Sequence, residues 1–284
     1  MFIWLHLAMT LSERNLFFKI GITFCAIIAL LTLAASFLTV PVYSAMEENS
    51  RRPTDFFQFI ISRFIKSDYY AVHASLSAAV LFSLIGMSLI HFFFERTSSP
   101  EILFIAIFTI SFSFEAMRLI LPLYLIFNFP SFYLLIAART LLFARYFSIF
   151  SLFAASVCAA GFETQRTRNI ILVIFVAVLF VTLGVPIDTQ NWDTTFNMIN
   201  GYTSMFGLIE VIAFFTTVIS FFVAAYVRRS REYVYIGIGV VLAMAGKTIL
   251  LGTDNWAGPF PGILLLSFGT SFLCAKLHKL HLWL

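Results

Sequence analysis

Residues 101–160 read EILFIAIFTISFSFEAMRLILPLYLIFNFPSFYLLIAARTLLFARYFSIFSLFAASVCAA. Two apolar runs flank the turn signal NFPS at residues 128–131, and each run is long enough to cross the ~30 Å hydrocarbon core of a bilayer as a helix. The runs contain four ionisable residues: Glu115, Arg118, Arg139 and Arg145. A charge at bilayer depth costs at least ~2.5 kcal/mol on insertion scales, so we expect these side chains to face neighbouring helices rather than lipid.

The composition of the whole chain is typical of a membrane protein. Of 284 residues, 61% are hydrophobic and only 11% are charged, whereas soluble domains carry about 25% charged residues. Mean hydropathy is +0.95, and apolar runs longer than ~18 residues recur along the sequence, which is the pattern of transmembrane helices. Cys25, Cys158 and Cys274 are far apart and form no metal or redox motif, so we expect them to be small apolar fillers.

The hydrophobic runs predict an all-α fold: one polytopic integral membrane helix bundle over residues 1–284. Its eight transmembrane helices are expected at about 16–40, 71–94, 102–127, 131–160, 169–185, 202–227, 233–251 and 260–277. A short interfacial amphipathic helix is also expected between the first two spans. There, Thr54 and Asp55 follow Pro53 as a helix start, and apolar residues then recur at helical spacing up to Ile65.

The distribution of lysine and arginine predicts the orientation. With eight spans, ten basic residues lie on one side: Arg14, Lys19, Arg96, Arg166, Arg168, Arg228, Arg229, Arg231, Lys276 and Lys279. The other side has four, all in the first loop: Arg51, Arg52, Arg63 and Lys66. Cytoplasmic loops carry the excess of positive charge, so we expect both termini in the cytoplasm and place the protein in a bacterial inner (plasma) membrane.

Depth along the helices predicts which buried charges meet. At 1.5 Å per residue, Glu115 and Arg145 both lie ~20 Å from the outer end of the hairpin that joins their spans. Glu210 and Lys247 each lie ~8–10 Å from the outer end of their own span. These are two depth-matched pairs of opposite charge. Small residues such as Gly239, Ala243 and Gly246 on the seventh span, and Ala137, Ala144, Ser148, Ser151 and Ala155 on the fourth, would let the helices pack closely.

The six intramembrane charges form the candidate ligand-binding site. Four cations face two carboxylates, so Arg118 and Arg139 are expected to lack an acidic partner. Guanidinium groups bind carboxylate and phosphate bidentately, and an electropositive pocket in the outer half of the bundle would suit such an anion. In one alternative, the Arg139 side chain extends to the outer interface instead of the pocket. In another, all six charges are structural links between helices. The six residues are Glu115, Arg118, Arg139, Arg145, Glu210 and Lys247.

Three functions remain open from the sequence. The first is a receptor or binding subunit for an anionic small molecule or lipid headgroup, which acts through a membrane protein partner. The second is a secondary transporter of a small anionic solute, in which the two ion pairs exchange partners. Apart from Pro122 the spans show little interruption by Gly or Pro, so broken helices are not expected, which argues against transport. The third is a purely structural membrane subunit.

Other chemistry has little support in the sequence. No spacing pairs a nucleophile with a base and no nucleotide-binding or metalloprotease motif occurs, so no cofactor is expected. An intramembrane enzyme acting on lipid, with Glu115 or Glu210 as the base, is the least favoured function. The basic residues lie beside the spans, which gives no nucleic-acid signal. Asp188, Asp193 and Asp254 are interpreted as solvated loop acids rather than a site for a divalent cation.

Overall fold

The computed structural model describes residues 10–47, 64, 66–95, 97, 99–161 and 167–282. The amphipathic helix predicted between the first two spans falls almost wholly outside these residues. The helices are α1 (Leu11–Glu47), α3 (Tyr69–Phe94), α4 (Pro100–Ser111), the 3-10 helix η2 (Phe112–Leu119), α5 (Ile120–Phe127), α6 (Phe132–Ala159), α7 (Thr167–Gly184), α8 (Thr203–Val227), α9 (Glu232–Gly252) and α10 (Pro259–Leu282). The strands are β1 (Ile187–Trp192) and β2 (Met198–Asn200).

Within the described residues, eight helices are long and apolar enough to cross a membrane, with α4, η2 and α5 counted as one. They coincide with the eight predicted spans, so the predicted all-α bundle is confirmed. The largest difference is at the first span, which was expected at 16–40 and extends over Leu11–Glu47. Length and apolarity are local properties of a segment, which is why the sequence located these helices.

The helix ends follow from local sequence. Asp68 caps α3, because its side chain accepts a hydrogen bond from Tyr70 N at 2.8 Å. Asn128 ends α5 in the left-handed conformation, and its amide donates to Tyr124 O. At the opposite end of the bundle, the buried Arg14 donates from Nη2 to the carbonyls of Phe94 and Glu95 at 2.8 and 3.0 Å, and so caps the C-terminus of α3 from α1.

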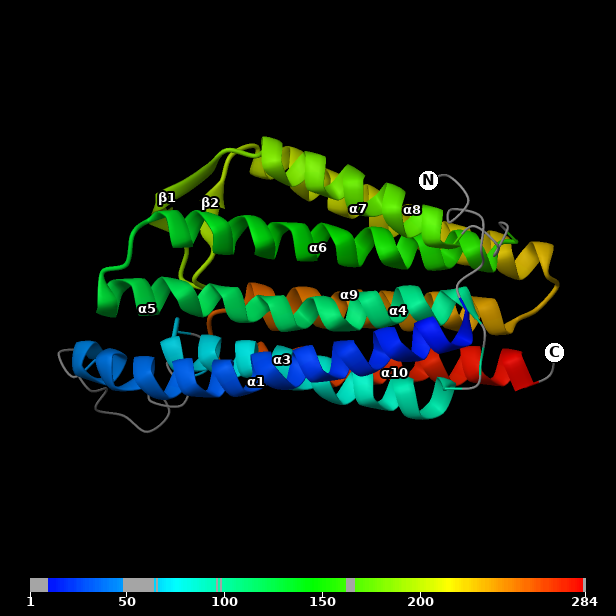
Figure 1. Cartoon of the computed structure of the whole chain (residues 1–284), viewed down its shortest axis with the longest axis horizontal. Coiled ribbons are helices and arrows are strands. Elements are labelled where there is room, and N and C mark those ends of the chain that lie inside the picture. The colour runs from blue at the N-terminus through cyan, green and yellow to red at the C-terminus, as the bar shows by residue number, and fades with distance from the viewer. Residues whose placement is uncertain are drawn as a thin grey trace.

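The helices form layers along one long axis (Figure 1). α6 and the α4–η2–α5 span lie in the middle, with α7 and α8 on one side and α1, α3 and α10 on the other. The start of α1 and the end of α10 lie at the same end of the bundle, and the β1–β2 hairpin lies at the opposite end. Burial is greatest along α4, where Glu101 to Thr109 are all buried. The third and fourth spans are therefore the centre of the fold.

The third span is not one continuous α-helix, so the expectation of unbroken helices is wrong. Residues 112–119 form a 3-10 helix between α4 and α5. The hydroxyl of Ser111 donates to Phe108 O at 2.6 Å and that of Ser113 to Ile110 O at 2.7 Å, so side chains compete for carbonyls at the junction. With 3.0 residues per turn, side chains three apart eclipse, and Glu115 therefore lies over Arg118.

The segment after α7 also differs from the sequence expectation, which was a polar loop over residues 186–201. It forms an antiparallel hairpin in which Ile187 pairs with Asn200 and Asp188 with Ile199. The hairpin tip, residues 193–197, folds back toward the bundle. Phe196 adopts a positive φ of 62° and is 5% exposed, packed with Leu119 and Leu134. A loop residue thus belongs to the core.

The contact between α9 and α10 depends on glycines, as the small residues on the seventh span predicted for close packing. A Cβ placed on Gly246 would lie 2.3 Å from Leu266 N and 2.8 Å from Gly262 O. On the facing helix, a Cβ on Gly269 would lie 2.5 Å from Ala243 N. Backbone atoms cannot retreat as a flexible side chain can, so the two helices require hydrogen at these positions.

We expect Gly246→Ala to destabilise the protein by ~1–3 kcal/mol, because the added methyl group overpacks a backbone contact. Gly207→Ala is the matched control, since Gly207 lies in α8 with nothing within 4 Å of its Cβ position. That control is expected to be neutral or to stabilise by up to ~1 kcal/mol through helix propensity. Unfolding of the two purified variants in a detergent titration measures the difference, and equal stability would contradict the close α9–α10 contact.

Candidate functional site

The site is centred on the carboxylate of Glu115, which is 2% exposed. Arg145 on α6 binds it bidentately, with Nε donating to Oε1 and Nη2 to Oε2, both at 2.8 Å. Arg118 on η2 adds an ion pair, with its Nε 2.8 Å from Oε2 but without hydrogen-bond geometry. The pairing of Glu115 with Arg145, predicted from depth, is confirmed. Bidentate, charge-assisted geometry is what a buried ion pair needs to offset its desolvation.

Arg118 is not left without partners, so the sequence expectation for it is wrong. Besides Glu115, its Nη1 donates to Leu251 O at 3.1 Å and to Thr195 O at 3.4 Å. Leu251 lies in the last turn of α9, where carbonyls lack intrahelical donors and the helix dipole is negative. Arg118 therefore links the third span to the end of α9 and to the hairpin tip. The sequence analysis counted only charged side chains, so it could not identify backbone carbonyls as partners of Arg118.

The hairpin tip completes the site with neutral acceptors that the sequence analysis missed. Asn197 Oδ1 accepts a hydrogen bond from Arg145 Nη2 at 3.0 Å. Asp193 holds the tip, because its Oδ1 accepts from the amides of Thr195 and Asn197 at 2.9 and 2.8 Å. An acidic residue followed by small polar residues is a turn signal, but nothing in the sequence shows that this turn reaches a helix interior.

The second predicted pair is present but loose. Lys247 Nζ lies 3.8 Å from Glu210 Oε1 and donates to Ser148 Oγ at 3.4 Å. Lys247 is buried at 6% exposure, whereas the Glu210 side chain is 45% exposed. Glu210 was expected to face inward and instead lies at the rim. We call Glu115, Arg118, Arg145 and Lys247, with Glu210 at the rim, the charged cluster.

Arg139 does not join the charged cluster. In the part of the chain that the structure describes, its Nε is buried without a hydrogen-bond partner. No ion pair or hydrogen bond between described residues connects Arg139 to the other five candidate residues. Depth placed Arg139 near Arg118, but the rotation of α6 about its axis places it on a different face.

Little empty space remains at the charged cluster. A cavity of about 20 Å³ lies between Arg118, Arg145 and the hairpin residues Phe196 and Asn197. That volume holds a water molecule and is too small for a carboxylate or a phosphate. In this conformation the hairpin tip occupies the space in which the sequence predicted an electropositive pocket. An anion would therefore have to displace the tip.

The carboxylates of Asp188 and Asp254 accept hydrogen bonds from loop residues. The Thr194 hydroxyl donates to Asp254 Oδ2 at 2.7 Å and holds the pKa of that carboxyl below its usual range. The Asn191 side chain donates to Asp188 at 2.7 Å and lowers the pKa of Asp188 in the same way. Among the described residues, no three His, Cys, Asp or Glu side chains gather closely enough to hold a metal ion. The bond from Thr194 to Asp254 also anchors the hairpin tip to the end of α9.

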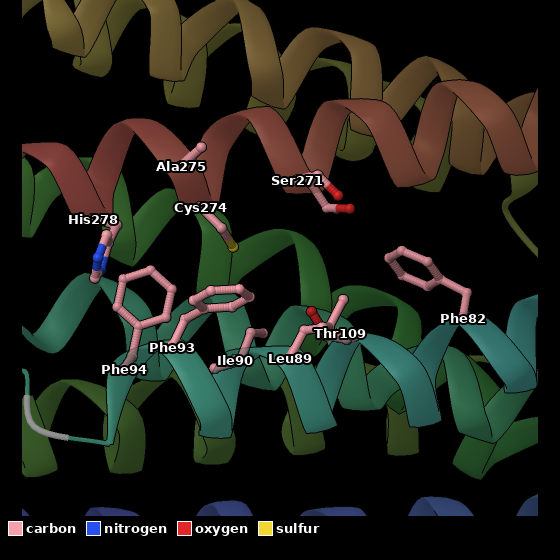
Figure 2. A pocket seen from close by; sticks show the side chains of 12 residues that line it. Phe82, Leu89, Ile90, Phe93, Phe94, Thr109, Ser271, Cys274, Ala275 and His278 are labelled. Carbon is pink, nitrogen blue, oxygen red and sulfur yellow. The ribbon is translucent and has the colours of Figure 1, made fainter.

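A separate cavity of about 290 Å³ lies between α3 and α10, and Figure 2 shows its lining. Phe82, Leu89 and Phe93 contribute rings and an aliphatic side chain from α3, while Cys274 and His278 contribute from α10. The described residues of the lining include no carboxylate, lysine or arginine. This cavity therefore suits an apolar group and is unrelated to the charged cluster.

No family model matches this chain, and a search of the curated proteins finds no match either. The assignment of a function therefore rests on the chemistry of the charged cluster and the hairpin tip. Their distinctive feature is that two guanidinium groups bind one fully buried carboxylate, and neutral oxygens of the hairpin complete the arginine contacts.

We expect Glu115→Gln to destabilise the protein by ~3–5 kcal/mol, because it leaves the buried Arg118 and the partly buried Arg145 without their shared counter-charge. Glu210→Gln is the matched control, since its loose and half-exposed ion pair contributes at most ~1 kcal/mol. Unfolding free energies of both variants in detergent test the difference. A loss for Glu115→Gln no larger than that for Glu210→Gln would contradict the central role of the carboxylate.

Proposed function

We propose that the chain is a multi-pass integral membrane protein of a bacterial inner membrane, with both termini in the cytoplasm. Large apolar side chains on the outside of the bundle support this location: Phe37 and Phe180 are each 82% exposed, and Tyr226 is 87% exposed. Water would penalise such a surface, whereas lipid tails solvate it. The basic residues at the start of α1 and the end of α10 lie away from the hairpin, which supports the orientation.

Within that membrane, we propose that the protein is a receptor or binding subunit for a small anionic group, a carboxylate or a phosphate. The site is the charged cluster, and the hairpin acts as its lid. Arg118 and Lys247 are buried, as is Glu115, whereas the Arg145 side chain is 26% exposed and the Glu210 side chain is 45% exposed. Asp193, which is exposed on the hairpin, also attracts both arginines. The buried groups alone therefore have one cation more than carboxylates in a region of low dielectric, while water screens the exposed acids, and this favours a further anion.

The observation that carries this proposal is the set of neutral acceptors on the hairpin tip. Asn197 Oδ1 and Thr195 O accept hydrogen bonds from Arg145 and Arg118 where the oxygens of an anion would bind. An anionic oxygen adds a Coulombic attraction to the guanidinium groups that a neutral oxygen lacks, so an anion can replace these acceptors. Displacement would move the hairpin at the bundle surface. A partner membrane protein in contact with the hairpin would then detect binding.

One observation favours the second candidate function, a secondary transporter of a small anionic solute. The 3-10 helix η2 interrupts the third span at the depth of Glu115 and Arg118. Short 3-10 stretches inside helices mark hinges, and transporters place their sites at discontinuous helices. In this alternative the carboxylate and the arginines would exchange partners while η2 changes conformation.

Inorganic phosphate is expected to raise the melting temperature of the detergent-purified protein, and the Asn197→Ala variant is expected to respond at lower phosphate concentrations. Removal of the amide oxygen eliminates a competitor for Arg145, which lowers the phosphate concentration at half-saturation by ~3–10-fold. Arg118→Gln should weaken the response by about tenfold or more, because a charged donor is lost. Arg139→Gln is the control outside the charged cluster and should respond as the unmodified protein does.

A flat response to phosphate and acetate in both the unmodified protein and Asn197→Ala would contradict the binding proposal and support a structural cluster. Transport is tested separately, by counterflow of labelled phosphate in proteoliposomes. Saturable uptake by the unmodified protein would favour the transporter. Phosphate binding without uptake would favour the receptor or binding subunit.

The orientation predicts the behaviour of topology reporters. Alkaline phosphatase fused after Leu284 is expected to be inactive, and the same enzyme inserted after Thr194 in the hairpin tip is expected to be active, because it functions outside the cytoplasm. A fluorescent protein at the same two positions should give the opposite result. Phosphatase activity at the C-terminus would overturn the proposed orientation without affecting the helix assignments.

A further inference from the structure

An apolar groove of about 800 Å³ lies between α1 and α7, with its floor on α4 and α6. Figure 1 shows α6 and α4 between these two helices. Phe17 and Phe24 line one wall, Leu172 and Phe175 the other, and Ile107 the floor. Both walls belong to helices whose exposed side chains are mostly apolar, so in a membrane the groove opens to lipid.

The groove has the depth of one leaflet. Along α1 its lining extends from Glu13 to Phe24, a rise of ~16 Å at 1.5 Å per residue. Half of a ~30 Å hydrocarbon core is ~15 Å. Glu13 lies in the first turn of α1 and Arg168 in the first turn of α7, and both helices begin at the end of the bundle opposite the hairpin. The groove therefore runs from the cytoplasmic interface to about the middle of the membrane.

Two exposed charges of opposite sign lie at the mouth of the groove. Glu13 Oε2 accepts from Thr10 N at 2.9 Å in an N-terminal capping box, which leaves Oε1 available. Arg168 forms no ion pair among the described residues. It also lies at the helix end where the dipole disfavours a cation and favours a phosphate. An external phosphate at Arg168 would relieve that unfavourable placement.

We propose that the groove binds a zwitterionic glycerophospholipid of the cytoplasmic leaflet, with its acyl chains on the apolar walls, its phosphate at Arg168 and its primary ammonium at Glu13. The charges at the mouth complement those of the headgroup in sign. A transmembrane helix of ~20 residues and ~10 Å diameter fills ~2,400 Å³, about three times the groove, so acyl chains fit where a helix does not. The inference rests on the proposed membrane location and is independent of the charged cluster.

The test measures lipid retained by the full chain in native mass spectrometry after exchange into detergent containing phosphatidylethanolamine, phosphatidylcholine or phosphatidylglycerol. The ethanolamine headgroup can donate to Glu13, whereas the quaternary ammonium of choline cannot and glycerol carries no cation. Phosphatidylethanolamine is expected to be retained about tenfold more than either, the effect of one hydrogen bond to a charged group. Equal retention of all three would overturn the proposed headgroup site.

Variants separate the groove from the rest of the lipid-facing surface. Leu172→Trp adds volume inside the groove and should reduce retention several-fold, whereas Val173→Trp changes the next residue, which is 63% exposed outside the groove, and should not. Glu13→Gln preserves the capping box and should remove only the preference for ethanolamine over choline. Arg168→Gln should reduce retention of both lipids, and Lys19→Gln, an exposed basic control on α1, should not.

Three results would overturn the inference. The first is equal retention by Leu172→Trp and Val173→Trp, and the second is no effect of Arg168→Gln. The third is a mass that corresponds to a second copy or to a bound protein in the groove. The rise in melting temperature with phosphate, measured on the same variants, distinguishes failure of the lipid proposal from failure of the proposed anion site. Leu172→Trp leaves the charged cluster unchanged and should retain any stabilisation by phosphate that depends on Arg118.

Discussion

The burial of one carboxylate between two guanidinium groups is the constraint on which the rest of the structure depends. Taking the Glu115 carboxylate out of water costs several kcal/mol, and only close, hydrogen-bonded counter-charges offset that cost. Arg145 comes from α6 and Arg118 from η2, and Arg118 continues to the last turn of α9 and to the hairpin. Three spans and the hairpin therefore meet where the carboxylate lies. In the proposed membrane location the hydrophobic effect would contribute little between helices, so this polar link and the glycine contact at Gly246 would determine how they pair.

Two departures from regular helix, the 3-10 helix and the hairpin tip, both contribute residues that contact the charged cluster. The first places Glu115 above Arg118, and the second supplies neutral oxygens to Arg118 and Arg145. An excess of buried positive charge with neutral acceptors is stable but can accept an anion, provided that the tip moves. The same arrangement would be purely structural if the tip were fixed. The anchoring of the tip by Asp193 and by the bond from Thr194 to Asp254 thus determines which behaviour the protein has.

The bundle contains two chemically different regions. The groove between α1 and α7 opens toward the end opposite the hairpin, and its lining extends to Phe114 and Ala144, the residues next to Glu115 and Arg145 of the charged cluster. The charged cluster would select ligands by charge, because guanidinium groups in low dielectric discriminate strongly between anions and neutral molecules. The groove would select mainly by shape and apolar contact, with the headgroup choosing among lipids. A lipid in the groove would contact α6, which also carries Arg145, so both regions share one helix.

The sequence by itself determined the eight helices and the depth of each charge, because apolar length and a rise of 1.5 Å per residue are local properties. Depth alone was sufficient to pair Glu115 with Arg145 and Lys247 with Glu210. Only the tertiary structure decided which way each side chain faces and what the loops reach. Rotation of α6 separated Arg139 from the charged cluster, the turn at residues 193–197 brought Asn197 to Arg145, and the end of α9 gave Arg118 a carbonyl. These outcomes depend on packing between segments distant in sequence, and neither apolar length nor residue spacing encodes that packing.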